Sequence, residues 1–147
     1  MVDVYHNTVG RNCILALDLA PDRSGLIPAA HAARYKELGD FIRSCYGESL
    51  TPNSWSSANG HYQMHFGRPT VADRVVLMED QSNGQVIRNY TVSGRGLDGK
   101  WTVLSHGTSI GHKKIDMFSP VTVTQIKVDA KGVDTPRWRS VSAHLCD

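Results

Sequence analysis

The spacing of apolar residues divides the chain into a short N-terminal region and a longer C-terminal one. Residues 13–17 (CILAL) form a short apolar run that predicts a strand. The apolar residues that follow recur at helical spacing: Leu38, Phe41, Ile42, Cys45 and Tyr46. Pro28 suits the first turn of a helix and Gly47 suits its end. Residues 1–47 are therefore expected to contain a strand followed by an amphipathic helix.

The pattern changes in the second region. Residues 48–60 are dominated by Ser, Thr, Asn, Pro and Gly, which predicts a linker or an irregular entry loop. Short segments that are β-branched or alternate with period two then follow one another: 62–66, 74–78, 86–92, 101–104, 114–118, 121–128 and 139–145. The dipeptides Asn83-Gly84 and Asp98-Gly99 favour tight hairpins between them. Residues 61–147 therefore predict an antiparallel β-sandwich.

The composition is that of an ordinary globular protein. Apolar residues make up 40% and charged residues 20% of the 147 positions, a length that suits one domain and is too short for a complete (β/α)₈ barrel. The net charge of +2 is scattered along the chain, so the basic stripe of a nucleic-acid partner is absent from the sequence. No apolar run approaches the length of a membrane helix, and the N-terminus lacks the pattern of a signal peptide.

Cysteines and one short motif bear on the compartment. Cys13, Cys45 and Cys146 allow one disulfide and one free thiol, and they contain no Cys-x-x-Cys unit of the kind that binds zinc. The triplet Asn89-Tyr90-Thr91 is an acceptor sequence for N-glycosylation. These features hint at an extracellular or lysosomal origin.

Two stretches resemble a known enzyme family. Residues 10–47, GRNCILALDLAPDRSGLIPAAHAARYKELGDFIRSCYG, resemble the last strand and closing helix of the catalytic barrel of the α-L-fucosidases. Residues 61–92, HYQMHFGRPTVADRVVLMEDQSNGQVIRNYTV, and residues 99–118, GKWTVLSHGTSIGHKKIDMF, resemble the C-terminal sandwich of that family. The resemblance implies a mainly β fold, an antiparallel galactose-binding-like (discoidin-like, jelly-roll) β-sandwich with an N-terminal strand-helix appendage. It also implies an extracellular or lysosomal location.

The same resemblance argues against catalysis by these residues. The strands that carry the catalytic groups of the family have no counterpart in this sequence, so the chain is not expected to be an enzyme. The best local carboxylate pair, Glu79 and Asp80, lies on a predicted strand, where adjacent side chains point to opposite faces and cannot flank one sugar. No cofactor is expected. Asp and Asn side chains in loops leave room for a structural calcium ion but define no ligand set.

Sugar recognition requires a flat apolar face beside convergent hydrogen-bonding groups. Loop or strand-end positions and polar chemistry select six candidate carbohydrate contacts: Trp55, His61, Glu79, Asp80, His112 and Arg137. His61 and His65 have a spacing that binds zinc on a helix, but the flanking alternation predicts a strand, on which they line a polar face.

The sequence thus supports two functions. The first is a lectin-like module that recognises a terminal galactose- or fucose-type sugar on glycans or glycoconjugates. The alternative is a non-binding structural piece, resembling the C-terminal end of a fucosidase, that packs on or complements a catalytic barrel. In the second case the apolar strand and helix of residues 11–47 would lie exposed unless covered, so a homo-oligomer is expected.

Overall fold

Two long, bent strands form the centre of the fold. The computed structural model describes residues 1–50 and 52–146. In it, β2 (His61–Glu79) and β5 (Lys114–Gly132) each span 19 residues and pair antiparallel. Register shifts between His65 and Thr70, and between Ala72 and Arg74, bend the pair so that each strand serves two layers. The predicted segments 62–66 and 74–78 are therefore halves of one strand, as are 114–118 and 121–128.

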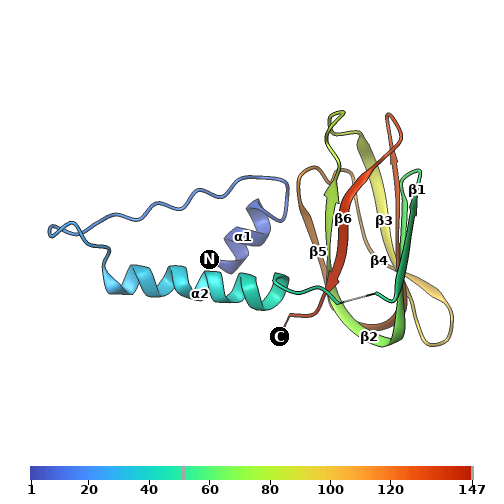
Figure 1. Cartoon of the computed structure of the whole chain (residues 1–147), viewed down its shortest axis with the longest axis horizontal. Coiled ribbons are helices and arrows are strands. Elements are labelled where there is room, and N and C mark those ends of the chain that lie inside the picture. The colour runs from blue at the N-terminus through green and yellow to red at the C-terminus, as the bar shows by residue number, and fades with distance from the viewer. Residues whose placement is uncertain (51, 147) are drawn as a thin grey trace.

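The remaining strands attach to these two. β1 (Ser54–Ala58) pairs with the first half of β2, and β3 (Ile87–Arg95) pairs with the second half of β5 and with β4 (Trp101–Gly107). β6 (Trp138–His144) pairs with the second half of β2. The first layer thus runs β1-β2-β5-β3-β4, and the second contains β6 with the other halves of β2 and β5 (Figure 1). This arrangement confirms the antiparallel β-sandwich.

The core lies between the two layers. Alternate residues of each strand point inward, and the largest fully buried ones include Met64, Leu77, Tyr90, Ile126 and Val128. The Tyr90 hydroxyl donates a 2.8 Å hydrogen bond to the buried carboxylate of Asp116, which also accepts one from Ser105. Burial raises the pKa of Tyr90 far above its usual value, so the hydroxyl remains a donor.

A helical arm projects from the sandwich. It contains α1 (Val2–Thr8) and α2 (Ala29–Tyr46), joined by an extended segment without regular structure over residues 12–28 (Figure 1). α2 confirms the predicted helix, whereas α1 was not predicted. The predicted strand at residues 13–17 is not formed in the structure. Within the described part of the chain no neighbouring strand pairs with its backbone groups, and Ile14 is 94% exposed.

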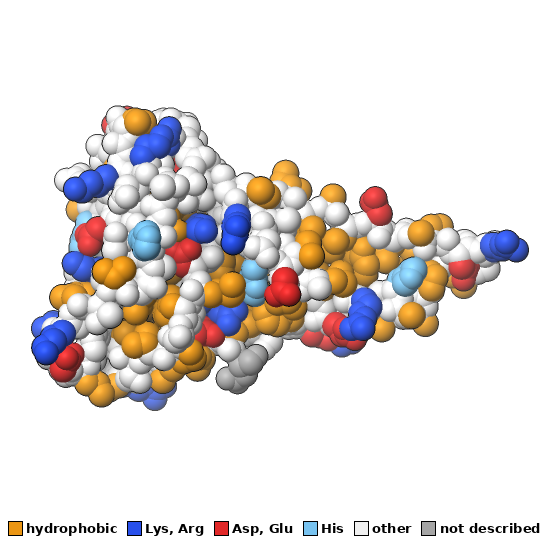
Figure 2. Space-filling model, turned by 180° about the vertical axis from the view of Figure 1, so that it is seen from behind, with side chains coloured by type: hydrophobic (Ala, Val, Ile, Leu, Met, Phe, Trp, Pro, Cys, Tyr) orange, Lys and Arg blue, Asp and Glu red, His pale blue; other side chains and the backbone are white. Residues whose placement is uncertain are grey.

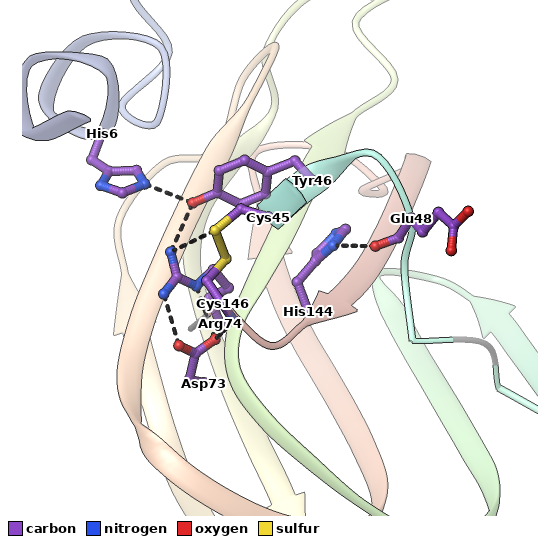
Figure 3. Close-up of a disulfide and its surroundings, with 8 residues drawn as sticks. All are labelled: His6, Cys45, Tyr46, Glu48, Asp73, Arg74, His144 and Cys146. Carbon is purple, nitrogen blue, oxygen red and sulfur yellow. Dashed lines mark hydrogen bonds and ion pairs between the residues drawn. A yellow bond between two sulfur atoms is a disulfide. The ribbon is translucent and has the colours of Figure 1, made fainter. Parts of the chain in front are cut away.

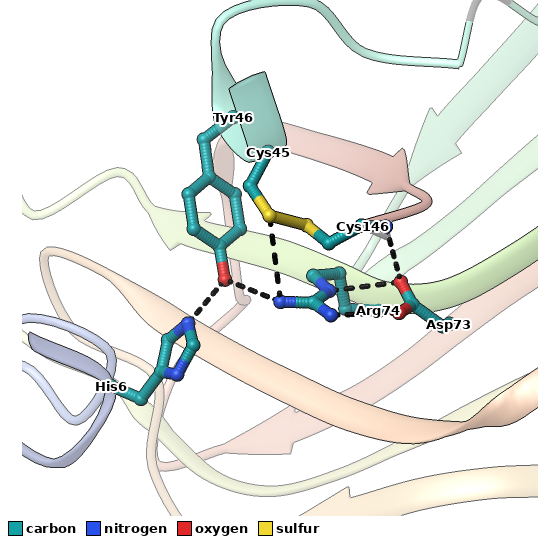
Figure 4. A network of polar contacts seen from close by, with 6 residues as sticks. All are labelled: His6, Cys45, Tyr46, Asp73, Arg74 and Cys146. Carbon is teal, nitrogen blue, oxygen red and sulfur yellow. Dashed lines mark hydrogen bonds and ion pairs between the residues drawn. A yellow bond between two sulfur atoms is a disulfide. The ribbon is translucent and has the colours of Figure 1, made fainter. Parts of the chain in front are cut away.

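The second layer of the sandwich holds the arm through an apolar contact and a polar network. Tyr5 of α1 and Leu38 of α2 pack with Val76 and Ile115 on the outer surface of this layer. The residues that join them electrostatically surround Arg74 of β2, as shown in Figure 4.

Arg74 connects both helices to the sheet. Its guanidinium donates to both carboxylate oxygens of Asp73, at 2.9 and 2.7 Å, and to the hydroxyl of Tyr46 at 3.2 Å. The Tyr46 hydroxyl in turn lies 2.7 Å from Nε2 of His6 on α1. The carboxylate of Asp73 also accepts a hydrogen bond from the backbone of Cys146 at 3.2 Å, so the network reaches the C-terminal end of the described chain.

A disulfide closes the same region. Cys45 at the end of α2 is bonded to Cys146 beyond β6 (Figure 3), while Cys13 is free and exposed. The one disulfide and one free thiol that the sequence allows are therefore present. The bond spans a separation of 101 residues, which encloses the entire sandwich.

Removing this disulfide should destabilise the chain. Replacing both Cys45 and Cys146 by Ala frees a loop of about 100 residues in the unfolded state, and we expect the free energy of unfolding to fall by about 2–5 kcal/mol. Urea denaturation followed by circular dichroism would measure this. Cys13→Ala, which changes an exposed thiol, is the control and should leave the midpoint unchanged. Equal stability of all three proteins would contradict the prediction.

The contact between the arm and the second layer should also weaken in acid. Burial, and secondarily Arg74, lower the pKa of His6, and burial lowers that of His144. Because each folded-state pKa lies below the unfolded value, the folded state binds fewer protons. The stabilising contribution is complete above about pH 6.5 and is lost as the pH falls through the folded pKa values.

Melting temperatures measured between about pH 7.5 and about pH 5 should therefore fall less steeply for His6→Gln than for the natural chain. Glutamine retains an acceptor for the Tyr46 hydroxyl but does not titrate. His31→Gln, at an exposed position of α2, should show the natural slope. Identical slopes for His6→Gln and the natural chain would exclude a contribution from His6.

Candidate functional site

The strand ends bring four loops together at one end of the sandwich, which we call the loop end: residues 59–60, 80–86, 108–113 and 133–137. Backbone hydrogen bonds connect them, from Val133 to Val86, from Ala130 to Gly60 and from Glu79 to Gly111. Five of the six predicted contacts lie in or next to these loops, and Trp55 lies on β1. The structure therefore gathers most of the predicted residues at one end, but it does not form one site from them.

Glu79 organises the loop end from inside. Its side chain is 1% exposed. Oε1 accepts hydrogen bonds from the backbone of Val86 at 2.6 Å and of Ile87 at 3.0 Å, and Oε2 accepts one from Gly111 at 3.1 Å. The prediction that Glu79 contacts a sugar is corrected by this burial, because its oxygens face the protein's own backbone.

Asp80 and Arg137 line the same small pocket. The backbone of Asp80 donates to the carbonyl of Arg137 at 2.9 Å. Hydrogen bonds from Ser82, and more weakly the charges of Arg137 and Arg139, lower the pKa of the Asp80 carboxyl, so it is ionised at neutral pH. The pocket has a volume of about 80 Å³. Pockets that enclose small ligands are usually ~300–1,000 Å³, so this one is too small to enclose a sugar.

The backbone at His112 is hydrogen-bonded to the arm. The backbone N–H of His112 donates to the side-chain oxygen of Asn12, and the backbone of Asn12 donates to the carbonyl of Lys113 at 2.9 Å. The imidazole of His112 is exposed. His112 is therefore not among the residues that line the pocket of Asp80 and Arg137, although all three adjoin the loop end.

Trp55 offers an aromatic surface beside the first layer. Its side chain is 63% exposed and stacks on Tyr62 with the ring centroids 5.6 Å apart and the planes 3° from parallel. Tyr62 in turn meets Trp138 edge-on, with centroids 6.4 Å apart. Residues 48–60 were predicted as a linker or loop, but β1 forms within them and orients Trp55, so this prediction is corrected in part.

His61 lines a larger pocket on the outer face of the first layer. The pocket has a volume of about 400 Å³ and lies against the β1–β2 turn, β2, β3 and β5. The Nδ1 atom of His61 is 2.7 Å from a carboxylate oxygen of Asp129. The polar residues that share this pocket with His61 were not predicted as carbohydrate contacts, and Asn89 and Thr91 were noted only in the glycosylation triplet: Asn59, Asn89, Thr91, Asp129 and Lys131. The period-two pattern of their strands was the available signal, since it places alternate polar residues on one face.

Within residues 1–50 and 52–146, no group of three or more His, Cys, Asp or Glu side chains is arranged to hold a metal ion. Neither helix of this part of the chain combines the length and apolarity that a bilayer span requires.

Comparison with known proteins finds similarity to the C-terminal part of α-L-fucosidases. No family model matches the sequence. The chain is 22% identical over 165 residues to "Putative alpha-L-fucosidase 1" of Oryza sativa subsp. japonica, which covers 90% of this chain and 32% of that protein. A Bacteroides thetaiotaomicron crystal structure, likewise named a putative α-L-fucosidase, matches with a TM-score of 0.90 and 32% identity. That match covers 99% of this chain and 33% of the other.

A third similarity concerns the fold alone. Chitosan-binding module 1 from a Paenibacillus chitosanase/glucanase superposes with a TM-score of 0.51 and 17% identity, over 62% of this chain and 74% of the module. The chain therefore matches the C-terminal part of α-L-fucosidases, as the sequence motifs indicated, and it spans about a third of the length of these relatives. Together these similarities fit a carbohydrate-related role.

The buried role of Glu79 can be tested by a minimal change. Glu79→Gln replaces one acceptor oxygen by an NH₂ group that faces backbone donors, and we expect a loss of about 1–3 kcal/mol in the free energy of unfolding. Amide hydrogen exchange at Val86, Ile87 and Gly111 should accelerate. Asp80→Asn, the neighbouring and accessible carboxylate, is the matched control. A Glu79→Gln protein as stable as Asp80→Asn would show that these contacts do not stabilise the loop end.

Proposed function

We propose that this chain acts as a non-catalytic C-terminal domain of an α-L-fucosidase-like protein and that its arm docks on a catalytic barrel. The observation that carries the proposal is the state of residues 12–28. This segment has the sequence of a barrel strand and turn, matches the fucosidases, and lies extended without a strand partner. A strand pattern without a partner is satisfied when neighbouring strands supply the missing hydrogen bonds.

Apolar side chains on the arm support the same conclusion. Hydrophobic atoms gather along the arm in Figure 2. The exposed ones include Met1, Val4, Ile14, Leu17, Leu19, Leu26 and Ile27. An apolar surface of this kind usually marks an interface. In the isolated chain the same surface promotes self-association, which is the homo-oligomer expected from the sequence.

A second candidate function is carbohydrate binding by the sandwich itself. The specific observation in its favour is the 400 Å³ pocket beside His61, whose lining side chains are of the types that bind hydroxyl groups. The terminal galactose- or fucose-type sugar expected from the sequence is proposed as its ligand. This binding is compatible with docking, because the arm packs on the second layer and the pocket opens on the first.

The compartment follows from covalent chemistry. A disulfide that encloses the sandwich persists in an oxidising environment. This feature supports the proposal that the chain is extracellular or lysosomal.

One substitution in two contexts tests the docking proposal. Ile14→Glu should leave the free energy of unfolding of this chain within about 0.5 kcal/mol of the natural value, because Ile14 is exposed. In a chimera where this chain replaces the corresponding third of the Bacteroides thetaiotaomicron protein, the same change should cost about 3 kcal/mol or more, because the new carboxylate is buried without a partner. Thermal and urea denaturation would compare the two.

Leu97→Glu supplies the matched control, since Leu97 is 69% exposed on the β3–β4 hairpin, away from the arm. It should be neutral in both contexts. If Ile14→Glu is neutral in the chimera as well, the arm does not dock on the barrel in the proposed way.

A further inference from the structure

Strand register aligns a row of polar side chains across the outer face of the first layer. His61 of β2 is paired with Asp129 of β5, and Asp129 is paired with Thr91 of β3. Directly paired residues in antiparallel strands point to the same face. The three side chains therefore lie side by side on the surface opposite the core.

The Asn59-Gly60 turn closes one end of this row. Both residues have positive φ angles, 49° and 80°, as a tight hairpin between β1 and β2 requires. Gly60 approaches β5 so closely that a Cβ atom would meet the carbonyl of Ala130 at 2.5 Å. Only glycine permits this contact, which places Asn59 at the rim of the pocket.

The charged groups in the pocket are held in fixed positions. One oxygen of Asp129 is 2.7 Å from His61, and the other is 3.4 Å from the ammonium group of Lys127. Although burial opposes it, these interactions lower the pKa of the Asp129 carboxyl, so the pocket contains an ionised acceptor at neutral pH. Around it, Asn89, Thr91 and Lys131 supply amide, hydroxyl and ammonium groups.

This lining selects for a ligand class. A carboxylate or phosphate would meet the negative charge of Asp129, and an organic cation would meet Lys131. An apolar ligand would leave the amide, hydroxyl and imidazole groups without partners, which costs binding energy. A neutral molecule rich in hydroxyl groups can donate hydrogen bonds to Asp129 and accept them from Lys131, because each hydroxyl both donates and accepts.

We infer that this outer-face pocket is a carbohydrate-binding site for a single neutral pyranose, held by hydroxyl contacts to His61, Asn89, Asp129 and Lys131. The inference rests on the carbohydrate-binding role proposed above as the second candidate function. It assigns that role to the pocket on the sheet face beside the Asn59-Gly60 turn and not to the pocket beside Asp80, which is about five times smaller. A pocket without an aromatic platform binds a single sugar weakly, so the affinity is expected to be millimolar.

The test is a titration of the ¹⁵N-labelled full chain with methyl α-L-fucopyranoside, methyl β-D-galactopyranoside and glycerol, observed by NMR. At least one of the two glycosides should shift the amide signals of His61, Asn89, Thr91 and Lys131 in a saturable manner, whereas glycerol should not. His61→Ala and Asn89→Ala should each weaken binding about tenfold, the effect of losing one well-placed hydrogen bond.

His65→Ala is the matched control, because His65 lies on the same strand and the same face as His61 but at the row of Gln125. It should bind as the natural chain does. The inference is overturned if neither glycoside shifts these signals, if the shifts map to residues 80–86 and 133–137, or if His65→Ala and His61→Ala weaken binding equally. Docking is measured by unfolding of the chimera and sugar binding by titration of the isolated chain, so either proposal can fail without the other.

Discussion

The pairing of β2 with β5 is the interaction on which the rest of the structure depends. These two strands are bonded to each other along both layers, and β1, β3 and β6 are each bonded to one of them. Their bends let a single pair of strands form the centre of one layer and then of the other. The outer face of the first layer carries the polar pocket, and the outer face of the second layer carries the arm. The same ladder of hydrogen bonds therefore separates the two proposed functions in space.

Burial of charged groups explains two densely hydrogen-bonded points of the fold. Glu79 and Asp73 are both buried carboxylates, and each has its oxygens occupied by fixed donors. At Glu79 the donors are backbone groups of two loops, so the carboxylate determines the shape of the loop end. At Asp73 the donors are the backbone of Cys146 and the guanidinium of Arg74, which also binds Tyr46 of α2. A buried charge is tolerated when every hydrogen-bonding position has a partner, and removing one partner is costly.

The sequence predicted the elements whose signal is local. The period of 3.6 in residues 29–46 and the alternation in the sandwich depend on neighbouring residues, and both were found. β1 was missed because Ser54, Ser56 and Ser57 suggest a loop, although Asn59-Gly60 is a hairpin signal of the same kind as Asn83-Gly84. The strand predicted at residues 13–17 is not formed, for the opposite reason. Its apolar pattern is correct for a strand, but a strand also requires a partner, which pattern alone does not reveal.

The residues of the candidate site likewise fall into those that the sequence predicted and those that it did not. Side-chain chemistry pointed to His61, Asp80 and Arg137, which do line pockets, and also to Glu79, whose burial depends on contacts with residues up to 32 positions away. Asn89, Asp129 and Lys131 were missed because they are far apart in sequence and meet only through the register of β2, β3 and β5. Register is a property of the assembled sheet, so the pocket becomes visible only in three dimensions.

The disulfide has a topological consequence for how force and cleavage act on the chain. Because Cys45 is bonded to Cys146, the sandwich is a closed covalent ring, and the arm is a branch that leaves the ring at α2. Tension applied through the N-terminal arm passes into the disulfide at the base of the ring, and the strands within it are shielded from the load. A single cut in any hairpin would open the ring without releasing a fragment. A domain built in this way can be pulled, or cut within one hairpin, and still remain covalently attached to its arm.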